Sequence, residues 1–377
     1  MKILFIAYHF EPYPGVGSQR ISYWAKHLNE VAPDIKVDVI TATKGCIQIP
    51  NGKVIYNEKK GTGLWTKFFK TDPGASWGYD IKKWLLKNGK SYDIVLFTGG
   101  PFLHFRVAKW IKKHTAVKII FDFRDPMSLN PRNKSNKISL ILKNRVMRII
   151  ERNFNKNADV IISVNKWCLS LLLGIKNKKK IIIDNGFDEI ISNEVRSSKN
   201  NIIEINDKIR FVYAGKFYPS GSQITFLEIL KNNTNLNGKI EFFHIGEPYP
   251  FLYPYKGEKW FIEFGQKSYY ETLSIIKQCD YGLIFPSGHP FESTTKIFDY
   301  IGMGLNVLMV ANIVPIDGAL VEYSKNYQQI EWVKNCQLKS FLCNNISKLK
   351  GNRRINYELS RKAGLLKLCT LIKEITS

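Results

Sequence analysis

The stretch that most restricts the fold is His289-Pro-Phe-Glu-Ser-Thr-Thr-Lys-Ile-Phe-Asp-Tyr-Ile-Gly-Met-Gly304, which continues into Leu305-Asn-Val-Leu-Met309. Residues 297–303 follow a helical pattern that stops at Gly304, as helices often do at a glycine. The apolar run over 307–310 comes next and predicts a buried strand. A helix followed at once by a buried strand is typical of α/β proteins.

The polar loop in front of this helix, from Glu292 to Lys296, predicts an anion site. Ser293, Thr294 and Thr295 are favourable N-cap residues. The first amides of the helix, together with the ammonium group of Lys296, would bind an anion such as a diphosphate. The alternative is an ordinary capped helix with a solvated lysine.

The length and composition predict a globular protein of two domains. The chain has 377 residues, of which 44% are hydrophobic and 13% aromatic. This is too long for one ordinary core and too apolar for disorder. The six cysteines show no C-x-x-C spacing, so we expect neither a zinc site nor a disulfide framework, and a reducing cytosol fits.

No segment of the sequence predicts insertion into a membrane. The first apolar run, residues 3–10, ends at Glu11-Pro12 and is too short for the core of a signal peptide. No later window has the roughly 18 apolar residues that a membrane span needs. Any membrane association is therefore expected to be peripheral.

The formal net charge of +24 is concentrated in the first half of the chain. Residues 1–190 hold 33 Lys and Arg against 15 Asp and Glu, whereas residues 191–377 hold 23 against 17. This asymmetry favours an anionic partner. We expect an anionic membrane surface and not nucleic acid, because the sequence has no zinc-finger spacing, RNA-binding signature or basic heptad region. A plain solvated surface is the alternative.

The first half opens with an apolar strand over 2–8, a glycine turn with Gly15, Gly17 and Arg20, and a helix over 21–28. This unit begins a doubly wound sheet, and its glycines would let a ligand approach the backbone. The turn is a poor match to the glycine fingerprint of nicotinamide-dinucleotide sites, because the third glycine of that fingerprint is missing. The alternative is a tight turn without a ligand.

Charged residues follow the strand that begins at Val117. Asp122, Arg124 and Asp125 stand together at its end, and ligands of open parallel sheets bind beyond the carboxyl ends of strands. We therefore expect at least one of them to face a ligand cleft. His104 follows the preceding strand, over 93–97, and is expected at the edge of that cleft.

Two segments of the first half combine apolar and basic residues. A helical pattern over 138–154 places Arg145, Arg148 and Arg152 on one face beside an apolar face. Such a helix suits an anionic membrane surface, or equally a surface helix docked on a domain core. The segment 64–70 interleaves aromatic rings with lysines, which suits either an interface or a packed subdomain with a charged rim.

The polar run over 192–201 is the best candidate for a linker. The second half then begins as the first did, with a strand over 209–214 and a glycine turn over 215–221. We therefore predict an α/β protein with two Rossmann-like domains, 1–190 and 205–350, facing each other across a ligand cleft.

Four segments, in this order, resemble one enzyme family. They are the glycine loop 15–20, Phe121-Asp-Phe-Arg-Asp-Pro126, Asp184-Asn-Gly-Phe-Asp188 and the stretch 294–304. The ordered set is similar to GT-B glycosyltransferases of the family 4 group, especially bacterial enzymes that build capsule, O-antigen or exopolysaccharide. The resemblance covers nearly the whole chain and implies that the helix over 357–377 packs back on the first domain.

The resemblance implies that the second domain binds a nucleotide-sugar donor, with UDP as the expected nucleotide. Lys216 stands where the family has an arginine that contacts phosphate, and the family's further lysine is missing, so Lys296 would supply the second charge. Asp299 matches the acid that holds the ribose, and Glu292 lies one position away from the family's other acid. The remaining donor residues of this group are Gly215, Gly246, Thr294 and Thr295.

The resemblance also implies the catalytic and acceptor residues. Asp125, with Arg124, stands where a polar residue reaches the donor sugar, and Glu292 is expected as the third catalytic residue. Gly15, Gly17, Arg20 and His104 would line the acceptor side. We expect a retaining transferase with no metal or other cofactor and a polyprenyl-diphosphate-linked or other glycan acceptor. The expected location is cytoplasmic, at the inner face of the membrane. The alternatives are a nucleotide-sugar 2-epimerase of the same fold and a non-catalytic basic protein that binds membranes or polyanions.

Overall fold

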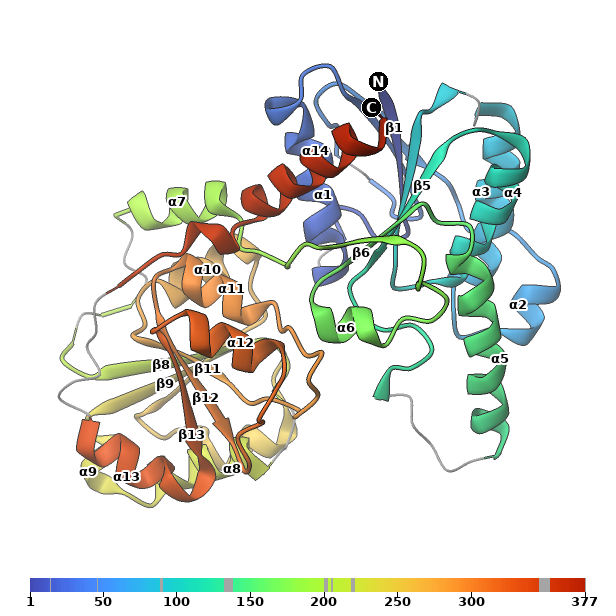
Figure 1. Cartoon of the computed structure of the whole chain (residues 1–377). Coiled ribbons are helices and arrows are strands. Elements are labelled where there is room, and N and C mark those ends of the chain that lie inside the picture. The colour runs from blue at the N-terminus through green and yellow to red at the C-terminus, as the bar shows by residue number, and fades with distance from the viewer. Residues whose placement is uncertain are drawn as a thin grey trace. The chain divides into compact units, whose positions relative to one another are not determined.

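The computed structural model describes residues 1–13, 15–45, 47–88, 91–131, 138–199, 203–204, 206–217, 221–345 and 353–376. Part of the predicted turn over 215–221, namely residues 218–220, lies outside the described residues. The chain divides into two compact units (Figure 1). Unit 1 comprises Met1–Asn185 and Ala363–Ser377, and unit 2 comprises Gly186–Lys362.

Unit 1 is built on a seven-stranded parallel sheet with the order β3-β2-β1-β4-β5-β6-β7. The strands are β1 (Lys2–Ala7), β2 (Lys36–Thr41), β3 (Val54–Tyr56), β4 (Ile94–Thr98), β5 (Lys118–Phe123), β6 (Val160–Ser163) and β7 (Lys179–Ile182). The strand β3 was not predicted, because its three residues at the edge of the sheet are too few to form a recognisable apolar run.

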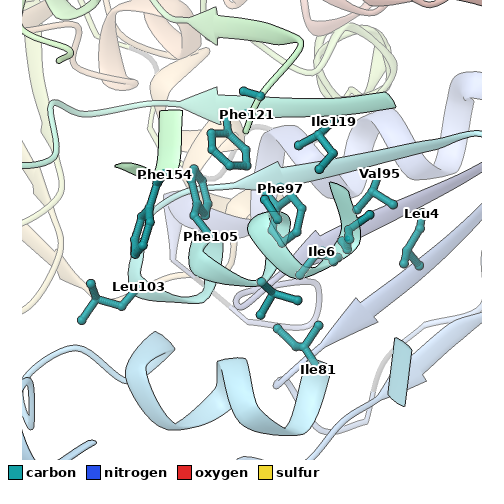
Figure 2. Close-up of a cluster of buried hydrophobic side chains, with 14 of the residues drawn as sticks. Leu4, Ile6, Ile81, Val95, Phe97, Leu103, Phe105, Ile119, Phe121 and Phe154 are labelled. Atoms are coloured by element: carbon teal, nitrogen blue, oxygen red, sulfur yellow. The ribbon is translucent and has the colours of Figure 1, made fainter. Parts of the chain in front are cut away.

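The helices of this part of the chain are α1 (Val16–Val31), α2 (Leu64–Phe68), α3 (Gly74–Asn88), α4 (Val107–His114), α5 (Ile138–Asn155), α6 (Lys166–Ser170) and α14 (Arg361–Thr376). The sheet separates two apolar cores. Figure 2 shows one of them, to which Leu4 and Ile6 of β1, Ile81 of α3 and Phe105 all belong. The other core begins with Ile3 and Phe5, because successive side chains of a strand point to opposite faces.

The C-terminal helix α14 packs on unit 1. Its Leu365, Leu368 and Ile372 are buried in the same core as Ile3 and Phe5 of β1. A short 3₁₀ turn, Tyr357–Leu359, precedes the helix, which begins at Arg361.

Unit 2 is built on a six-stranded parallel sheet with the order β10-β9-β8-β11-β12-β13. The strands are β8 (Ile209–Ala214), β9 (Ile240–Ile245), β10 (Phe261–Gly265), β11 (Tyr281–Ile284), β12 (Asn306–Ala311) and β13 (Ile330–Lys334). The helices are α7 (Glu189–Ser197), α8 (Gly221–Lys231), α9 (Thr234–Asn237), α10 (Tyr269–Ile276), α11 (Lys296–Gly302), α12 (Ala319–Asn326) and α13 (Asn335–Asn345). The predicted α/β class with parallel sheets is therefore confirmed.

The prediction of a linker over 192–201 is wrong for residues 192–199, the part that the structure describes, because most of them belong to helix α7. The Asp188 side chain accepts a hydrogen bond from the amide of Ile191 and so caps the helix. Val195 is fully buried, and Lys277 donates to its carbonyl oxygen at 3.1 Å. The helix buries a single narrow face, so its composition resembles that of a loop. Residues 200 and 201 lie outside the described part of the chain.

In the described residues, no helix is both long enough and apolar enough to cross a membrane.

Candidate functional site

In unit 2, two glycines bring the ends of β8 and β9 close together. Gly215 has φ +110°, a conformation that favours glycine, and its amide donates to Ile245 O at 2.7 Å. A Cβ on Gly246 would lie only 2.5 Å from the carbonyl oxygen of Gly215. Beneath the turn, Nε2 of the buried His244 lies 3.2 Å from the same oxygen. The backbone at Gly215 therefore requires glycine at both positions.

Lys296, the first residue of α11, reaches this glycine turn. A Cβ on Gly215 would lie 3.4 Å from Lys296 Nζ, and Nζ lies 4.7 Å from the centroid of the Tyr213 ring. Burial lowers the pKa of the Lys296 ammonium, while the carboxylates of Glu292 and Asp299 oppose that change. The structure thus brings together two residues that the sequence assigned to the donor site, and it places a cation beside an accessible stretch of backbone.

Lys216, the other predicted phosphate ligand, follows Gly215 directly and its side chain is exposed. Its carbonyl oxygen accepts a hydrogen bond from Tyr213 OH at 3.2 Å, which fixes the backbone at this position. Lys216 and Lys296 therefore both belong to the surroundings of the glycine turn.

The predicted hydroxyl cap of α11 is wrong for Thr295. This residue occupies the N-cap position, but its dihedral angles are helical. Its side chain makes no capping hydrogen bond to the described residues of the helix. The amides of Phe298 and Asp299 instead donate to its carbonyl oxygen, at 3.1 and 3.4 Å. Thr294 and Thr295 are half-buried and lie directly before Lys296.

Glu292 fixes the loop between β11 and α11. Its Oε2 accepts hydrogen bonds from the amide and the hydroxyl of Ser287, at 2.7 and 2.6 Å. Because its charge also acts on Lys296, Glu292 links the loop to the cation of the site. The structure therefore gives Glu292 a positioning role in the loop.

Asp299 lies one helical turn after Lys296, in a cluster of polar groups that the sequence did not reveal. Tyr269 OH donates to its Oδ1 at 2.7 Å, and nearby Arg361 pairs with Asp188 at 3.2 Å. Burial raises the pKa of Asp299 to about 6, although the Arg361 guanidinium and the Tyr269 hydrogen bond act in the opposite direction. Tyr269, Arg361 and Asp188 come from separate segments, so no local pattern could have linked them to Asp299.

In unit 1, Arg124 connects the start of helix α1 with the turn that follows strand β4. Its guanidinium donates to Val16 O at 3.2 Å and to Gly99 O at 2.7 Å. A Cβ on Gly17 would lie 3.4 Å from this guanidinium, so Gly17 is a direct neighbour of Arg124. Gly15 precedes α1, and its carbonyl oxygen accepts a hydrogen bond from the amide of Ser18 at 3.1 Å. Asp125 is exposed at the end of β5.

Arg20 was expected at the surface of a cleft, but it is buried. Only 4% of the residue is exposed, and its Nη2 pairs with Asp122 Oδ1 at 3.1 Å. Its Nη1 also donates to Ile183 O at 2.8 Å. Asp122 is one of the three charged residues of which at least one was expected to face the cleft, and it is fully buried beside Arg20. These two charges are held together inside unit 1.

His104 was expected at a cleft edge, and this position is also wrong. The residue is fully buried among the rings of Trp77, Phe97 and Phe105. Burial lowers the pKa of His104 to about 3, with a smaller contribution from the positive charge of Arg106. His104 is therefore a neutral core residue. The aromatic residues around it in space are not all near it in sequence, which is why the sequence did not show its burial.

No protein-family model matches the chain, and no curated protein sequence matches it. Several solved structures are nevertheless similar over the whole chain. Sucrose-phosphate synthase from Thermosynechococcus elongatus has 14% identity and a TM-score of 0.72, covering 100% of this chain and 99% of that one. The UDP-forming α,α-trehalose-phosphate synthase from Burkholderia xenovorans has 8% identity and a TM-score of 0.66, with full coverage of both chains.

A protein assigned as a UDP-N-acetylglucosamine 2-epimerase, from Listeria monocytogenes, is also similar, at 12% identity and a TM-score of 0.61. The alignment covers 100% of this chain and 96% of that one. Identities this low show the fold alone, and the same fold serves sugar transfer and epimerisation. The chain has two α/β units, each built on a sheet of parallel strands, and with these neighbours it has the GT-B fold.

Proposed function

We propose that the protein is a metal-independent, retaining glycosyltransferase. It moves a sugar from a nucleotide diphosphate, expected to be UDP, to a polyprenyl-diphosphate-linked or other glycan acceptor in the synthesis of a bacterial surface polysaccharide. One observation supports this proposal above the others: unit 2 holds the Lys296 ammonium beside the glycine turn at Gly215. The retaining outcome and the type of polysaccharide rest on the family 4 resemblance.

The mechanism follows from the charge that develops on the leaving group. As the bond between the sugar carbon and the diphosphate oxygen breaks, its electron pair passes to the diphosphate. Lys296 and Lys216 would stabilise that negative charge more strongly in the transition state than in the ground state. The acceptor hydroxyl oxygen forms the new bond, and its proton leaves with the diphosphate. Asp299 would hold the ribose, and Glu292 would keep the loop before α11 in place.

Unit 1 would supply the acceptor side of the reaction. In this proposal, Asp125 and Arg124 stand at the end of β5, and the start of α1, with Gly15 and Gly17, lies within reach of Arg124. Because Arg20 and His104 are buried, they would act only through the packing of unit 1.

An anionic membrane surface is the proposed partner of unit 1, with the protein at the inner face of the membrane. Helix α5 packs Ile150 and Phe154 against the core but leaves Leu142, Val146 and Ile149 about half exposed, at 55%, 46% and 57%. Arg145 and Arg148 lie on the same exposed side. Exposed apolar side chains beside arginines suit a headgroup layer, where rings and aliphatic chains insert and cations meet phosphate.

Helix α2 carries further exposed apolar side chains near α5. Leu64 and Phe68 are 65% and 71% exposed, and the ring of Trp65 lies 6.0 Å from that of Phe154 in α5. The apolar surface of unit 1 therefore extends over two neighbouring helices, which supports membrane contact.

The experiment that tests the proposal measures nucleotide binding and turnover together. In a thermal-shift screen, UDP or another nucleoside diphosphate should raise the midpoint with the logarithm of its concentration. Incubation with a UDP-sugar alone should give only slow hydrolysis, and transfer should need an acceptor. Formation of an epimer without acceptor would favour the 2-epimerase. The absence of any nucleotide response would refute both enzymes and leave a non-catalytic anion-binding protein.

A further inference from the structure

A cavity of about 570 Å³ lies within unit 1, at the carboxyl ends of β4 and β5. Its volume is in the range of small-molecule sites, roughly 300 to 1,000 Å³. Segments that are distant in sequence form its walls: residues 69–72, the turn after β4, the segment after β5, and one side of helix α5. Of the proposed site residues, Asp125 lines this cavity.

The polar part of the wall is rich in carboxylates and amides. Asp72 and Asp125 contribute carboxylates, and Asn130 and Asn144 contribute amides. Asp72 is held in place by the backbone amides of Gly74, at 2.8 Å, and Phe102, at 3.4 Å. The one lysine of the described wall, Lys143, donates to Thr71 Oγ1 at 3.3 Å.

This set of groups selects a ligand with hydroxyl groups. Carboxylates accept hydrogen bonds from hydroxyls, and carboxamides both donate and accept. A diphosphate would face two carboxylates, Asp72 and Asp125, against one ammonium group, Lys143. The cavity is therefore suited to a neutral polyhydroxylated group and not to the phosphates of a donor or a lipid carrier.

The rest of the wall is apolar. Its side chains include Phe69, Phe102, Leu103, Met127, Leu140 and Met147, while Thr71 and Ser128 add hydroxyl groups to the polar part. Rings such as Phe69 and Phe102 can cover the C–H face of a sugar while the polar groups bind its edge. Leu140 also continues into the exposed side of α5, because 37% of it is accessible.

We infer that this cavity binds the terminal hexose of the glycan acceptor. The inference rests on the proposed function and adds to it a site, with Asp72, Asn130 and Asn144 as residues that select the sugar. Asp125 places the cavity next to the proposed site of transfer. The position of Leu140 places it next to the surface proposed to contact the membrane, from which a lipid-linked sugar would come.

Methionine methyl groups provide a direct probe of the cavity. The chain has five methionines, and two of them, Met127 and Met147, line this cavity. Met1 lines a different cavity, at the amino ends of β1 and β4, and Met303 and Met309 lie in unit 2. Protein labelled with ¹³C at the methionine methyl groups would be titrated with octyl glycosides of glucose, galactose, mannose and N-acetylglucosamine.

At least one glycoside should shift the Met127 and Met147 resonances saturably and leave those of Met1, Met303 and Met309 unchanged. Asn144→Ala should weaken this binding at least tenfold. The control, Asn153→Ala, changes the same residue type on an exposed position of α5 outside the cavity and should have no effect. Each resonance is assigned by a Met→Leu substitution.

Three results would overturn the inference: no methionine shift with any glycoside, equal shifts with octyl tetraethylene glycol, which has the chain but no sugar, or unchanged binding in Asn144→Ala. A thermal-shift titration of the same preparation with UDP separates the two proposals. Nucleotide binding without a glycoside response would overturn the sugar cavity alone, whereas no response to either ligand would overturn the proposed function too.

Discussion

Replacing Lys296 by alanine is the most direct test of the donor site. The substitution removes a cation whose Nζ lies beside the Gly215 backbone and over the Tyr213 ring. A unit charge about 4 Å from a phosphate oxygen is worth roughly 4 kcal/mol at an effective dielectric constant of about 20. Removal of a single group that stabilises a developing negative charge costs roughly 3 kcal/mol. At about 1.4 kcal/mol for each tenfold change, turnover should fall about a hundredfold or more.

The assay is the initial rate of nucleoside diphosphate release from a UDP-sugar in the presence of a glycoside acceptor. Lys296→Arg restores the charge and should recover part of the rate. The matched control is Lys325→Ala, which removes an exposed lysine in the last turn of α12 and should leave the rate unchanged. Both alanine variants should keep the wild-type thermal midpoint within a few degrees, since neither lysine is part of an apolar core.

A folded Lys296→Ala variant with turnover within a few-fold of wild type would contradict this prediction. The cation would then not face the diphosphate, and the assignment of the turn at Gly215 as the phosphate site would have to be abandoned. A loss of rate in the Lys325→Ala control of the same size would equally refute it, because the effect would then follow net charge and not position.

Four further predictions concern stability and surface binding. Burial raises the pKa of the Asp299 carboxyl from 3.8 to about 6. The protonated carboxyl therefore contributes its full share to the free energy of unfolding below about pH 4, and this contribution is lost as the pH rises through 6. The test is the difference between the free energies of unfolding of wild type and of Asp299→Asn, measured by urea denaturation. This difference should fall by up to about 3 kcal/mol from pH 4 to 7. A difference that does not change with pH would contradict the prediction. Gly246→Ala places a methyl group 2.5 Å from Gly215 O, so it should lower the free energy of unfolding by about 1 to 3 kcal/mol and weaken nucleotide binding. In the control Gly238→Ala, the new Cβ would come no closer than 3.4 Å to its nearest neighbour, so the loss of stability should be smaller. Arg20→Met leaves the buried Asp122 carboxylate without its ion-pair partner and should lower the free energy of unfolding by about 3 to 5 kcal/mol. The double variant Arg20→Met/Asp122→Asn should recover stability. Equal denaturation midpoints for Arg20→Met and wild type would show that the pair does not stabilise the fold. In a vesicle sedimentation assay, Arg145→Glu/Arg148→Glu should weaken binding to anionic vesicles by about 1 kcal/mol or more per residue, and unchanged binding would argue against α5 as the contact surface.

Much of the sheet architecture could be predicted from the sequence, because the strands of parallel sheets are covered on both faces and read as apolar runs. Residues 209–214 and 281–285 are such runs, and the structure has strands β8 and β11 at these places. Short or partly exposed strands have no such apolar run, so they could not be predicted. The strand β13, Ile330–Lys334, lies at the edge of its sheet, buries only Ile330 and Val333, and carries no apolar run.

Burial of individual polar residues could not be predicted. Arg20 and His104 both follow strands of unit 1, which is where ligand-binding residues occur in open sheets. The structure instead pairs Arg20 with Asp122 and surrounds His104 with aromatic rings. A charged or titratable side chain looks the same in sequence whether it faces a ligand or a buried partner on another strand.

By itself, the sequence determined the alternation of strands and helices, the repetition of that pattern in two halves and the basic excess of the first half, since these depend on local periodicity and composition. Only the tertiary structure decided that Lys296 meets Gly215, that Tyr269 bonds to Asp299, and that separate segments enclose a cavity beside Asp125. Such contacts join residues far apart in the chain. They form only when buried apolar surface brings the elements together, and no local pattern encodes which side chains will then face each other.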